Sequence, residues 1–337
     1  MGFHPNNYRR IREEYETKYL RAREDAERRR REVERAFPEI EQLHRELSSV
    51  GLAIMRVSLQ AASEEERLAG IASLRQKNEA LLTKRSALLQ AAGYPSDYTE
   101  LRYECPHCSD TGFLDDGTMC RCMREKLIAA GYASSGLGAL LGTQSFDNYS
   151  LDYFKNDEKT FRTMRMVLQT LKDYANNFSP HATDRMPAGG NLLFVGGTGL
   201  GKTHLSTAVA KAVLDRGFDV VYTGAVGMVA AFENARFGSS VGMADTSDIE
   251  RYYECDLLII DDLGTEVSNQ FTISSIYQVI NTRLNLHRPT IISTNLMQDE
   301  LRRRYWDRIT SRLFGEFQIL LFLGTDIRAQ KIRQARS

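Results

Sequence analysis

The chain has 337 residues, of which 42% are hydrophobic and 26% charged, so it is long enough for two domains and has an ordinary soluble composition. Its 44 basic and 44 acidic residues cancel, so any nucleic-acid contact requires a local basic patch. The first residues lack the apolar core of a signal peptide, and runs such as Ile319–Leu323 are far shorter than the roughly 20 apolar residues that cross a bilayer. We therefore expect a cytoplasmic protein with no membrane partner.

Residues 1–100 are expected to form an α-helical coiled-coil arm. Arg and Glu are frequent over residues 6–93, and Pro38 divides the helical stretch. Ser63-Glu-Glu-Glu66 is a capping box that can start a further helix. Apolar positions then recur at coiled-coil spacing: Leu43, Leu47, Val50, Ile54, Val57 and Ala61, followed by Leu74, Leu81 and Leu88. The pattern fits equally a helix pair that closes on itself and an arm presented to a protein partner.

Residues 101–124 are expected to form a small zinc knuckle. Four of the five cysteines, in two closely spaced pairs, fall in this segment: Cys105, Cys108, Cys120 and Cys122. Asp115-Asp-Gly117 supplies a turn between the pairs, so four thiolates can meet around one tetrahedral Zn²⁺. His107 is an alternative ligand, although its place inside the first pair favours a bystander. We expect the fifth cysteine, Cys255, to be a buried packing residue.

Residues 125–145 are rich in small side chains around 129–138 and predict a mobile linker, after which residues 146–337 alternate between strands and helices. The expected strands are 191–195, 219–223, 256–260, 289–295 and 317–323, and the expected helices are 202–216, 225–236, 272–286 and 299–314. This alternation predicts an α/β fold, in which a parallel five-stranded sheet is covered on both faces and binds ligands at the carboxyl ends of its strands.

A phosphate-binding loop of the pattern GxxxxGK[ST] directly follows the apolar run Leu192–Val195. Backbone N–H groups of such a loop converge on phosphate oxygens, and the helix that follows directs its positive dipole end at them. Lys202 is expected to reach the β- and γ-phosphates of ATP or ADP, and Thr203 to hold Mg²⁺. The expected nucleotide-binding residues of this segment are Gly196, Gly197, Thr198, Gly199, Leu200, Gly201, Lys202, Thr203 and His204.

A second nucleotide-site signal is the buried-strand pattern 256–260, which ends in Asp261 and Asp262. This is the Walker B arrangement. Phosphoryl transfer needs one acid to hold the metal and a second group to orient or deprotonate the attacking water. Asp261 fits the first task, as a Mg²⁺ ligand with Thr203, and Asp262 fits the second.

These motifs together resemble a known family. Phe146-Asp-Asn-Tyr149, the phosphate-binding loop, Leu257–Gly264, Ser293-Thr-Asn295 and Asp307–Arg312 resemble the AAA+ ATPases of the DnaA/DnaC/IstB branch. With the helical arm and the cysteine knuckle in front, the chain is most similar to the DnaC/DnaI-type replicative helicase loaders. The resemblance covers about residues 143–330 and implies an AAA+ P-loop NTPase core that hydrolyses ATP to ADP and phosphate. Asp262, where most AAA+ proteins have Glu, suggests slow turnover.

The resemblance also implies site roles. Asn295 corresponds to sensor 1, an amide able to hydrogen-bond the γ-phosphate or the attacking water. Arg312 corresponds to an arginine finger offered to a neighbouring subunit's ATP, with Arg308 as a second contact or a surface ion-pair partner. Arg328 corresponds to a sensor 2 arginine that acts within its own subunit.

The function implied is ATP-dependent loading of a hexameric replicative DNA helicase onto single-stranded DNA, with self-association through the ATP sites. Candidate DNA contacts are the Arg302–Arg304 cluster and the helix at Val226–Arg236. Two alternatives stay open. One is an IstB-like transposition helper that acts with a transposase, and the other is an adaptor that binds ATP without hydrolysing it.

Overall fold

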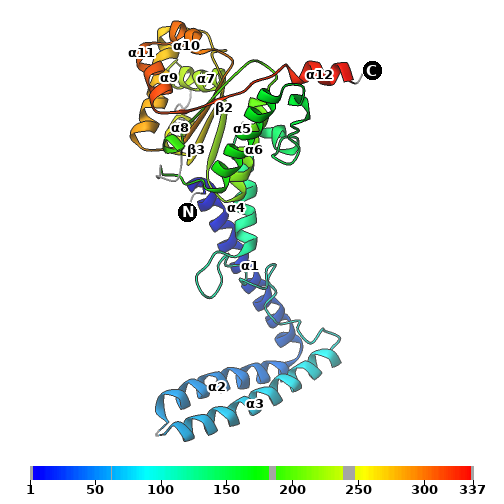
Figure 1. The fold of residues 1–337 in the computed structure, drawn as a ribbon. Coiled ribbons are helices and arrows are strands. Elements are labelled where there is room, and N and C mark those ends of the chain that lie inside the picture. The colour runs from blue at the N-terminus through cyan, green and yellow to red at the C-terminus, as the bar shows by residue number, and fades with distance from the viewer. Residues whose placement is uncertain (1–2, 62, 182–186, 238–246, 335–337) are drawn as a thin grey trace. The chain divides into compact units, whose positions relative to one another are not determined.

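The computed structural model describes the chain except residues 1–2, 62, 182–186, 238–246 and 335–337 (Figure 1). It divides into two compact units. One unit is Arg12–Met123, and the other combines Met1–Ile11 with Arg124–Ser337. Residues 12–100 of the expected arm and nearly all of the expected cysteine segment therefore share one unit, whereas residues 1–11 and all the strands expected for the nucleotide domain lie in the other.

Three long helices dominate the N-terminal part of the chain: α1 (Pro5–Ala36), α2 (Pro38–Gln60) and α3 (Glu64–Ala91). Pro38 occupies the first turn of α2, where its missing N–H costs nothing. The Ser63 side chain accepts a hydrogen bond from the Glu66 N–H at 3.2 Å and so caps α3. Both expected helix starts are confirmed, and α2 and α3 form an antiparallel hairpin (Figure 1).

The hairpin has a small hydrophobic core at its base. Val33, Ile40 and Leu89 form a small core there, with aromatic side chains such as Phe37 and Tyr94 packed against it. Of the expected coiled-coil positions on α2, Leu43 and Val50 are buried, whereas Leu47, Ile54 and Val57 are half-buried. Five large apolar side chains of the hairpin are exposed: Leu52, Met55 and Leu59 on α2, and Leu68 and Leu82 on α3.

The second unit is built on a five-stranded sheet with the order β2-β3-β4-β1-β5, in which every pairing is parallel. Its strands are β1 (Leu192–Val195), β2 (Val220–Gly224), β3 (Leu257–Leu263), β4 (Thr290–Thr294) and β5 (Gln318–Leu321). The predicted α/β fold with a parallel five-stranded sheet is confirmed. Because β1, β3 and β4 are neighbours, the segments that follow them meet at one edge of the sheet.

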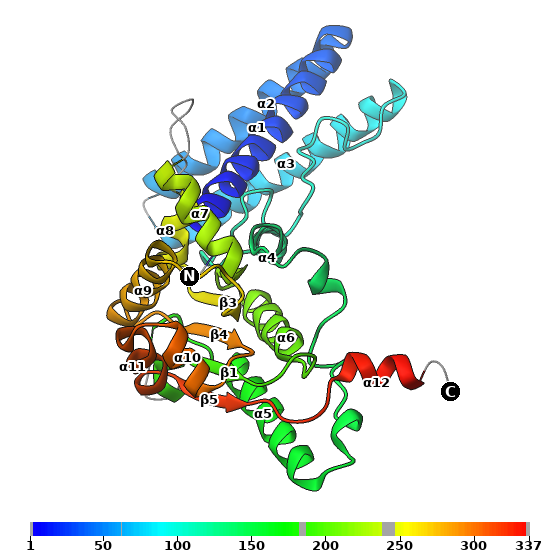
Figure 2. The same cartoon turned by 90° about the horizontal axis from the view of Figure 1, so that it is seen from above.

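Helices cover both faces of this sheet, with α5 and α6 on one side and α7, α9, α10 and α11 on the other (Figure 2). The helices and 3-10 turns are α4 (Arg121–Ser134), η1 (Gly138–Gly142), η2 (Asp152–Phe154), α5 (Glu158–Asn176), η3 (Pro187–Gly190), α6 (Lys202–Asp215), α7 (Ala225–Phe237), α8 (Ser247–Glu254), α9 (Gln270–Asn285), α10 (Gln298–Arg304), α11 (Asp307–Gly315) and α12 (Ile327–Gln334). Strand residues alternate between the faces: Leu192 and Phe194 join the α5–α6 core, whereas Leu193 and Val195 join the opposite one.

Two expectations about local structure are wrong. The stretch expected as a mobile linker begins inside helix α4, where Gly131 lets the helix approach Leu214 of α6: a Cβ at Gly131 would lie 3.3 Å from the Leu214 Cδ2. The single helix expected over 299–314 is two helices, because Tyr305 adopts an extended conformation between α10 and α11. In both places a tertiary contact overrides the local sequence pattern.

Candidate nucleotide site

The phosphate-binding loop connects β1 to α6, as the sequence predicts, and two of its glycines are required by the local geometry. A Cβ on Gly196 would lie 2.3 Å from the backbone oxygen of Phe322, so no larger residue fits there. Gly201 has φ +88° at the start of α6, and a Cβ there would lie 2.8 Å from the Tyr149 ring. The loop is therefore held close to β5 and to the 146–149 segment.

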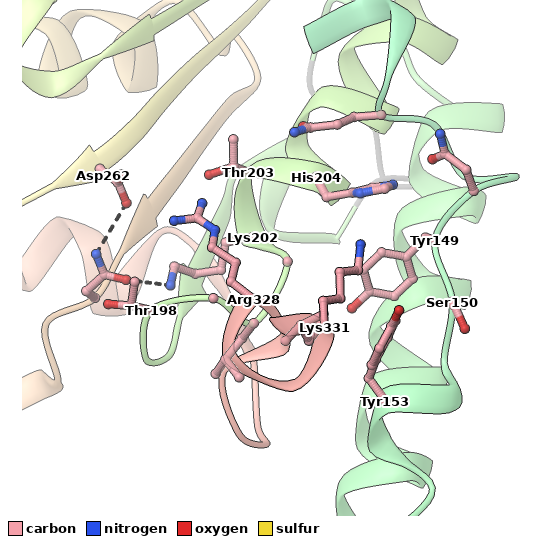
Figure 3. Close-up of a pocket in the computed structure, with 17 residues that line it drawn as sticks. Tyr149, Ser150, Tyr153, Thr198, Lys202, Thr203, His204, Asp262, Arg328 and Lys331 are labelled. Atoms are coloured by element: carbon pink, nitrogen blue, oxygen red, sulfur yellow. Dashed lines mark hydrogen bonds between the residues drawn. The ribbon is translucent and has the colours of Figure 1, made fainter. Parts of the chain in front are cut away.

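Lys202 points into the loop and is almost fully buried, with 4% of its surface exposed. Its ammonium donates hydrogen bonds to the backbone oxygens of Gly196 and Gly197, both at 2.7 Å. It also donates to Asn295 Oδ1 at 2.6 Å, a bond that Figure 3 marks with a dashed line. Burial lowers the pKa of Lys202, although Asp262 and Asp261 oppose that shift. The structure thus joins the predicted phosphate-binding lysine to the predicted sensor 1 amide.

Asp261 lies at the carboxyl end of β3 and is buried within a set of hydroxyl donors. Its Oδ2 accepts hydrogen bonds from Thr203 Oγ1 at 2.9 Å and from the Tyr222 hydroxyl at 2.7 Å, and its Oδ1 accepts one from Ser293 Oγ. The predicted pair of magnesium ligands, Thr203 and Asp261, is therefore in contact. Carboxylate and hydroxyl oxygens are the ligands that Mg²⁺ prefers, so this pair fits the metal.

Tyr222 and Ser293 were not predicted from the sequence. Ser293 stands two residues before Asn295 on β4, so strand alternation alone would have placed both side chains on one face. Tyr222 on β2 has no such local signal, because its contact with Asp261 depends on the pairing of β2 with β3.

Asp262 has a left-handed backbone conformation with φ +54°, at a register shift between β3 and β4. Its N–H donates to Ser293 Oγ at 2.9 Å, and its Oδ1 accepts a 3.3 Å hydrogen bond from the Asn295 side chain. Burial and the neighbouring Asp261 charge raise the pKa of Asp262. A strained acid with a raised pKa is typical of a group that orients or accepts a proton from a reactant.

Residues 198–203 of the loop, together with Asp262 and Asn295, line a pocket of about 330 Å³. Beyond these residues, its walls carry Gln144, Asn148, Tyr149, Tyr153 and Lys331. His204 lines the same pocket, and its Nε2 lies 2.8 Å from the backbone oxygen of Ser145. The Arg328 side chain enters from α12 and points toward Lys202 (Figure 3). Arg328 therefore lies in the same pocket as Lys202.

Arg308 and Arg312 lie elsewhere in the unit that contains the sheet. Arg312 Nε donates to Asn281 Oδ1 at 2.9 Å, and its guanidinium sits 4.9 Å from the centre of the Tyr277 ring, both on α9. Neither arginine is among the described residues that line the pocket. Any role for them in ATP hydrolysis therefore requires the site of another molecule.

The four cysteines expected to bind zinc come together in the other unit. Their sulfur atoms all lie within 4.8 Å of one another, with 3.9 Å between Cys105 and Cys120 and 3.6 Å between Cys108 and Cys122. Tetrahedral Zn²⁺ with Zn–S bonds near 2.3 Å requires sulfur separations of about 3.8 Å. The Asp110 carboxylate accepts the N–H groups of Glu104 and Cys105, both at 2.8 Å, and so holds the first knuckle closed. The geometry and chemistry of these residues fit zinc.

The candidate DNA contacts are altered by the structure. Arg304 forms an ion pair with the buried Glu266, at 3.5 Å, so it is not available to a phosphate. Arg302 and Arg303 remain exposed on α10. On α7, Arg236 lies 5.4 Å from the centre of the Phe271 ring, and Val226 is exposed. The expected three-arginine cluster is therefore reduced to two.

Within the part of the chain that the structure describes, none of the helices combines the length and the apolar character that a bilayer crossing requires.

Comparison with known proteins agrees with the site. Residues 182–314 match the family of IstB-like ATP binding proteins. The replicative helicase loader DnaC of Escherichia coli K12 is 24% identical over 179 residues, which cover 53% of this chain and 66% of that protein, so less than two thirds of the relative is spanned. A putative insertion sequence ATP-binding protein of Sinorhizobium fredii is 30% identical over 119 residues, 35% of this chain and 38% of that protein. Among solved structures, a DnaC helicase loader shows 22% identity, a TM-score of 0.47, and coverage of 55% of this chain and all of that one.

Proposed function

We propose that the chain is an ATP-dependent loader of a hexameric replicative helicase. Residues 182–314 match the IstB-like ATP binding proteins, and the chain is similar to the loader DnaC. Both similarities favour the DnaC/IstB branch of the AAA+ proteins. The observation that carries the proposal is the joined set of Lys202, Asn295, Asp261 and Asp262 at one sheet edge. Such a set both binds a triphosphate and responds to its γ-phosphate.

In the proposed reaction, Lys202 exchanges its contacts with the loop carbonyls for the β- and γ-phosphate oxygens. Thr203 and Asp261 would hold Mg²⁺, which when bound neutralises charge on those oxygens. Asp262 accepts a proton from the water that attacks the γ-phosphorus, while the bond to the β-γ bridging oxygen breaks and ADP leaves. Asn295, already bonded to both Lys202 and Asp262, orients that water.

Arg312 completes the site of a neighbouring protomer in this proposal. Arg312 belongs to α11, and its guanidinium packs against Asn281 and Tyr277 of α9, away from the pocket of its own subunit. A fixed, planar cation suits charge that develops in the transition state. Hydrolysis would thus occur only in an assembly, which makes ATP a switch for self-association. In that assembly, the exposed side chains of Arg302 and Arg303 would bind the phosphates of single-stranded DNA.

The exposed apolar side chains of the α2–α3 hairpin are the proposed contact with the helicase. Leu52, Met55 and Leu59 lie along one side of α2 at helical spacing, and Leu68 adds a fourth from α3. The zinc site would stabilise the cysteine segment of the same unit, which is too small for a core of its own.

The test is retention of the helicase by the immobilised full chain. Met55→Glu should abolish retention of the host's hexameric replicative helicase, whereas Met166→Glu should leave it intact. Both methionines are similarly exposed, at 61% and 65%, but Met166 lies on α5. Equal retention by all three proteins would exclude the hairpin as the contact, and no retention by the unaltered chain would exclude the loader function.

A transposition helper is the second candidate, because the matched family and the Sinorhizobium fredii relative are both of the insertion-sequence type. It predicts retention of a transposase and tighter binding to duplex than to single-stranded DNA. An ATP-binding adaptor without hydrolysis predicts no phosphate release with or without single-stranded DNA. These outcomes separate the three functions in one set of assays.

A further inference from the structure

Glu266 is a buried carboxylate that has no part in the proposed chemistry. It lies in the turn after β3, four residues beyond Asp262, and only 3% of its surface is exposed. Its Oε2 accepts the N–H of Gly264 at 2.8 Å, and its Oε1 accepts the Tyr305 hydroxyl and lies 3.5 Å from Arg304 Nε. Arg304 also donates to the backbone oxygen of Glu266.

On one side, Glu266 belongs to a turn that is fixed to the catalytic edge of the sheet. Thr265 Oγ1 donates to the backbone oxygen of Asp262 at 2.8 Å. Thr294 Oγ1, from β4, donates to the backbone oxygen of Leu263 at 2.7 Å. The turn therefore cannot shift without moving the acids.

On the other side, Glu266 holds the corner between α10 and α11. Tyr305 is buried and extended, and it is the residue at which the two helices separate. Burial and the hydrogen bond to Glu266 raise the pKa of Tyr305, so it remains a neutral donor. Helix α11, which begins two residues later at Asp307, carries Arg308 and Arg312. Because the Glu266 carboxylate is buried, removing its partners Arg304 and Tyr305 would leave a costly unpaired charge, so these contacts hold the corner.

We propose that Glu266 is a positioning residue that fixes the direction of α11 from the sheet edge, and thereby presents Arg312 to the ATP site of a neighbouring copy of this chain. The inference rests on the proposed action of Arg312 between protomers. It adds a defined mechanical link, through Arg304 and Tyr305, from the acids of one protomer to the site of the next.

The experiment is subunit mixing. An acceptor variant, Arg312→Ala, keeps its ATP site but offers no arginine, and a donor variant, Lys202→Ala, offers the arginine but has no working site. Each alone should turn over little ATP, and a 1:1 mixture should recover at least about tenfold, since an arginine finger contributes on the order of a thousandfold or more. If this parental pair fails to complement, the action of Arg312 between protomers is refuted, and this inference falls with it.

With complementation established, Tyr305→Phe is added to one partner at a time. This substitution removes the hydroxyl that donates to Glu266. It keeps the aromatic ring and the hydrogen bond from the Gly264 N–H to Glu266. Placed on the donor, it should cut the recovered turnover at least about tenfold, and placed on the acceptor it should change it less than about twofold. Glu266→Gln, whose amide oxygen can still accept from Gly264, should give the same asymmetry.

The matched control is Tyr253→Phe on the donor, because Tyr253 packs against the same core and its hydroxyl has no hydrogen-bond partner among the residues that the structure describes. It should leave complementation unchanged. Loss on the acceptor, or equal loss on both partners, would show that Glu266 acts on its own subunit's site. No loss in either position would show that it only contributes packing.

Discussion

Neutralising Asp262 should stabilise the ATPase unit while abolishing ATP turnover. The residue has φ +54°, a left-handed conformation that asparagine adopts more readily than most residues. Its raised pKa means that the folded state disfavours the carboxylate, owing first to burial and then to Asp261. In the unaltered protein, the Asn295 side chain donates to Asp262 Oδ1 at 3.3 Å. Asp262→Asn removes the charge and still offers an amide oxygen as acceptor for that hydrogen bond.

We expect Asp262→Asn to raise the free energy of unfolding by about 1 kcal/mol. The gain is modest because Asp262 is only partly buried, so solvent already screens its charge. For a unit of this size that corresponds to a rise in Tm of about 2–4 °C. The sign also depends on pH. The unfolded carboxyl ionises first as pH rises, so the folded protein loses stability between the ordinary pKa and the raised one. The advantage of Asp262→Asn should therefore be full above the raised pKa and vanish below the ordinary one.

Thermal unfolding followed by circular dichroism, with phosphate release measured on the same samples, tests this. Asp261→Asn is the matched control, because its carboxylate accepts three hydroxyl hydrogen bonds. Neutralising it should destabilise the protein by roughly 2 kcal/mol. If both substitutions lower Tm equally, or if Asp262→Asn keeps its turnover, the reasoning about the two acids is wrong.

Three other predictions follow from single sites. Lys202→Ala should weaken ATP binding at least about a hundredfold by fluorescence titration. Arg312→Ala should instead change the ATP affinity less than about twofold and cut turnover at least about a hundredfold. Equal loss of affinity in the two variants would place Arg312 in its own subunit's site. Metal analysis should find one zinc per chain, and a chelator should lower the Tm of the arm-containing unit; a metal-replete, reduced sample without zinc would refute the site. Arg283→Met should destabilise the protein by about 3 kcal/mol in urea titration. The reason is that the fully buried guanidinium donates to the backbone oxygens of residues 252, 253, 255 and 289 and to the Thr290 hydroxyl. A loss of stability below about 1 kcal/mol would show that those oxygens find other donors.

The sequence was sufficient for the parts of this protein that depend on neighbouring residues. The phosphate-binding loop, the acids at the end of β3, the capping of α3 by Ser63 and the grouping of four cysteines are local patterns, and the structure has each of them. Strand alternation with helices was enough to predict a parallel sheet, since no other arrangement connects such elements with short loops.

What could not be predicted depends on contacts between distant segments. The α10–α11 break exists because Tyr305 bonds to Glu266, 39 positions away. Arg304 reads as a free cation in the sequence, but the same buried acid binds it. Tyr222 supports Asp261 only because β2 pairs with β3. Small residues near Gly131 suggest a linker, yet the chain there is helical through Ser134 and Gly131 allows close packing against Leu214.

The central claim, that ATP held by this site drives helicase loading, is tested most directly by counting helicase hexamers on closed single-stranded DNA circles. Purified helicase is incubated with the circles, ATP and the full chain, and stable complexes are isolated by gel filtration. The account predicts a several-fold increase in circles carrying a hexamer with the unaltered chain, and no increase with Lys202→Ala. An equal increase with both proteins, or none with either, would contradict it.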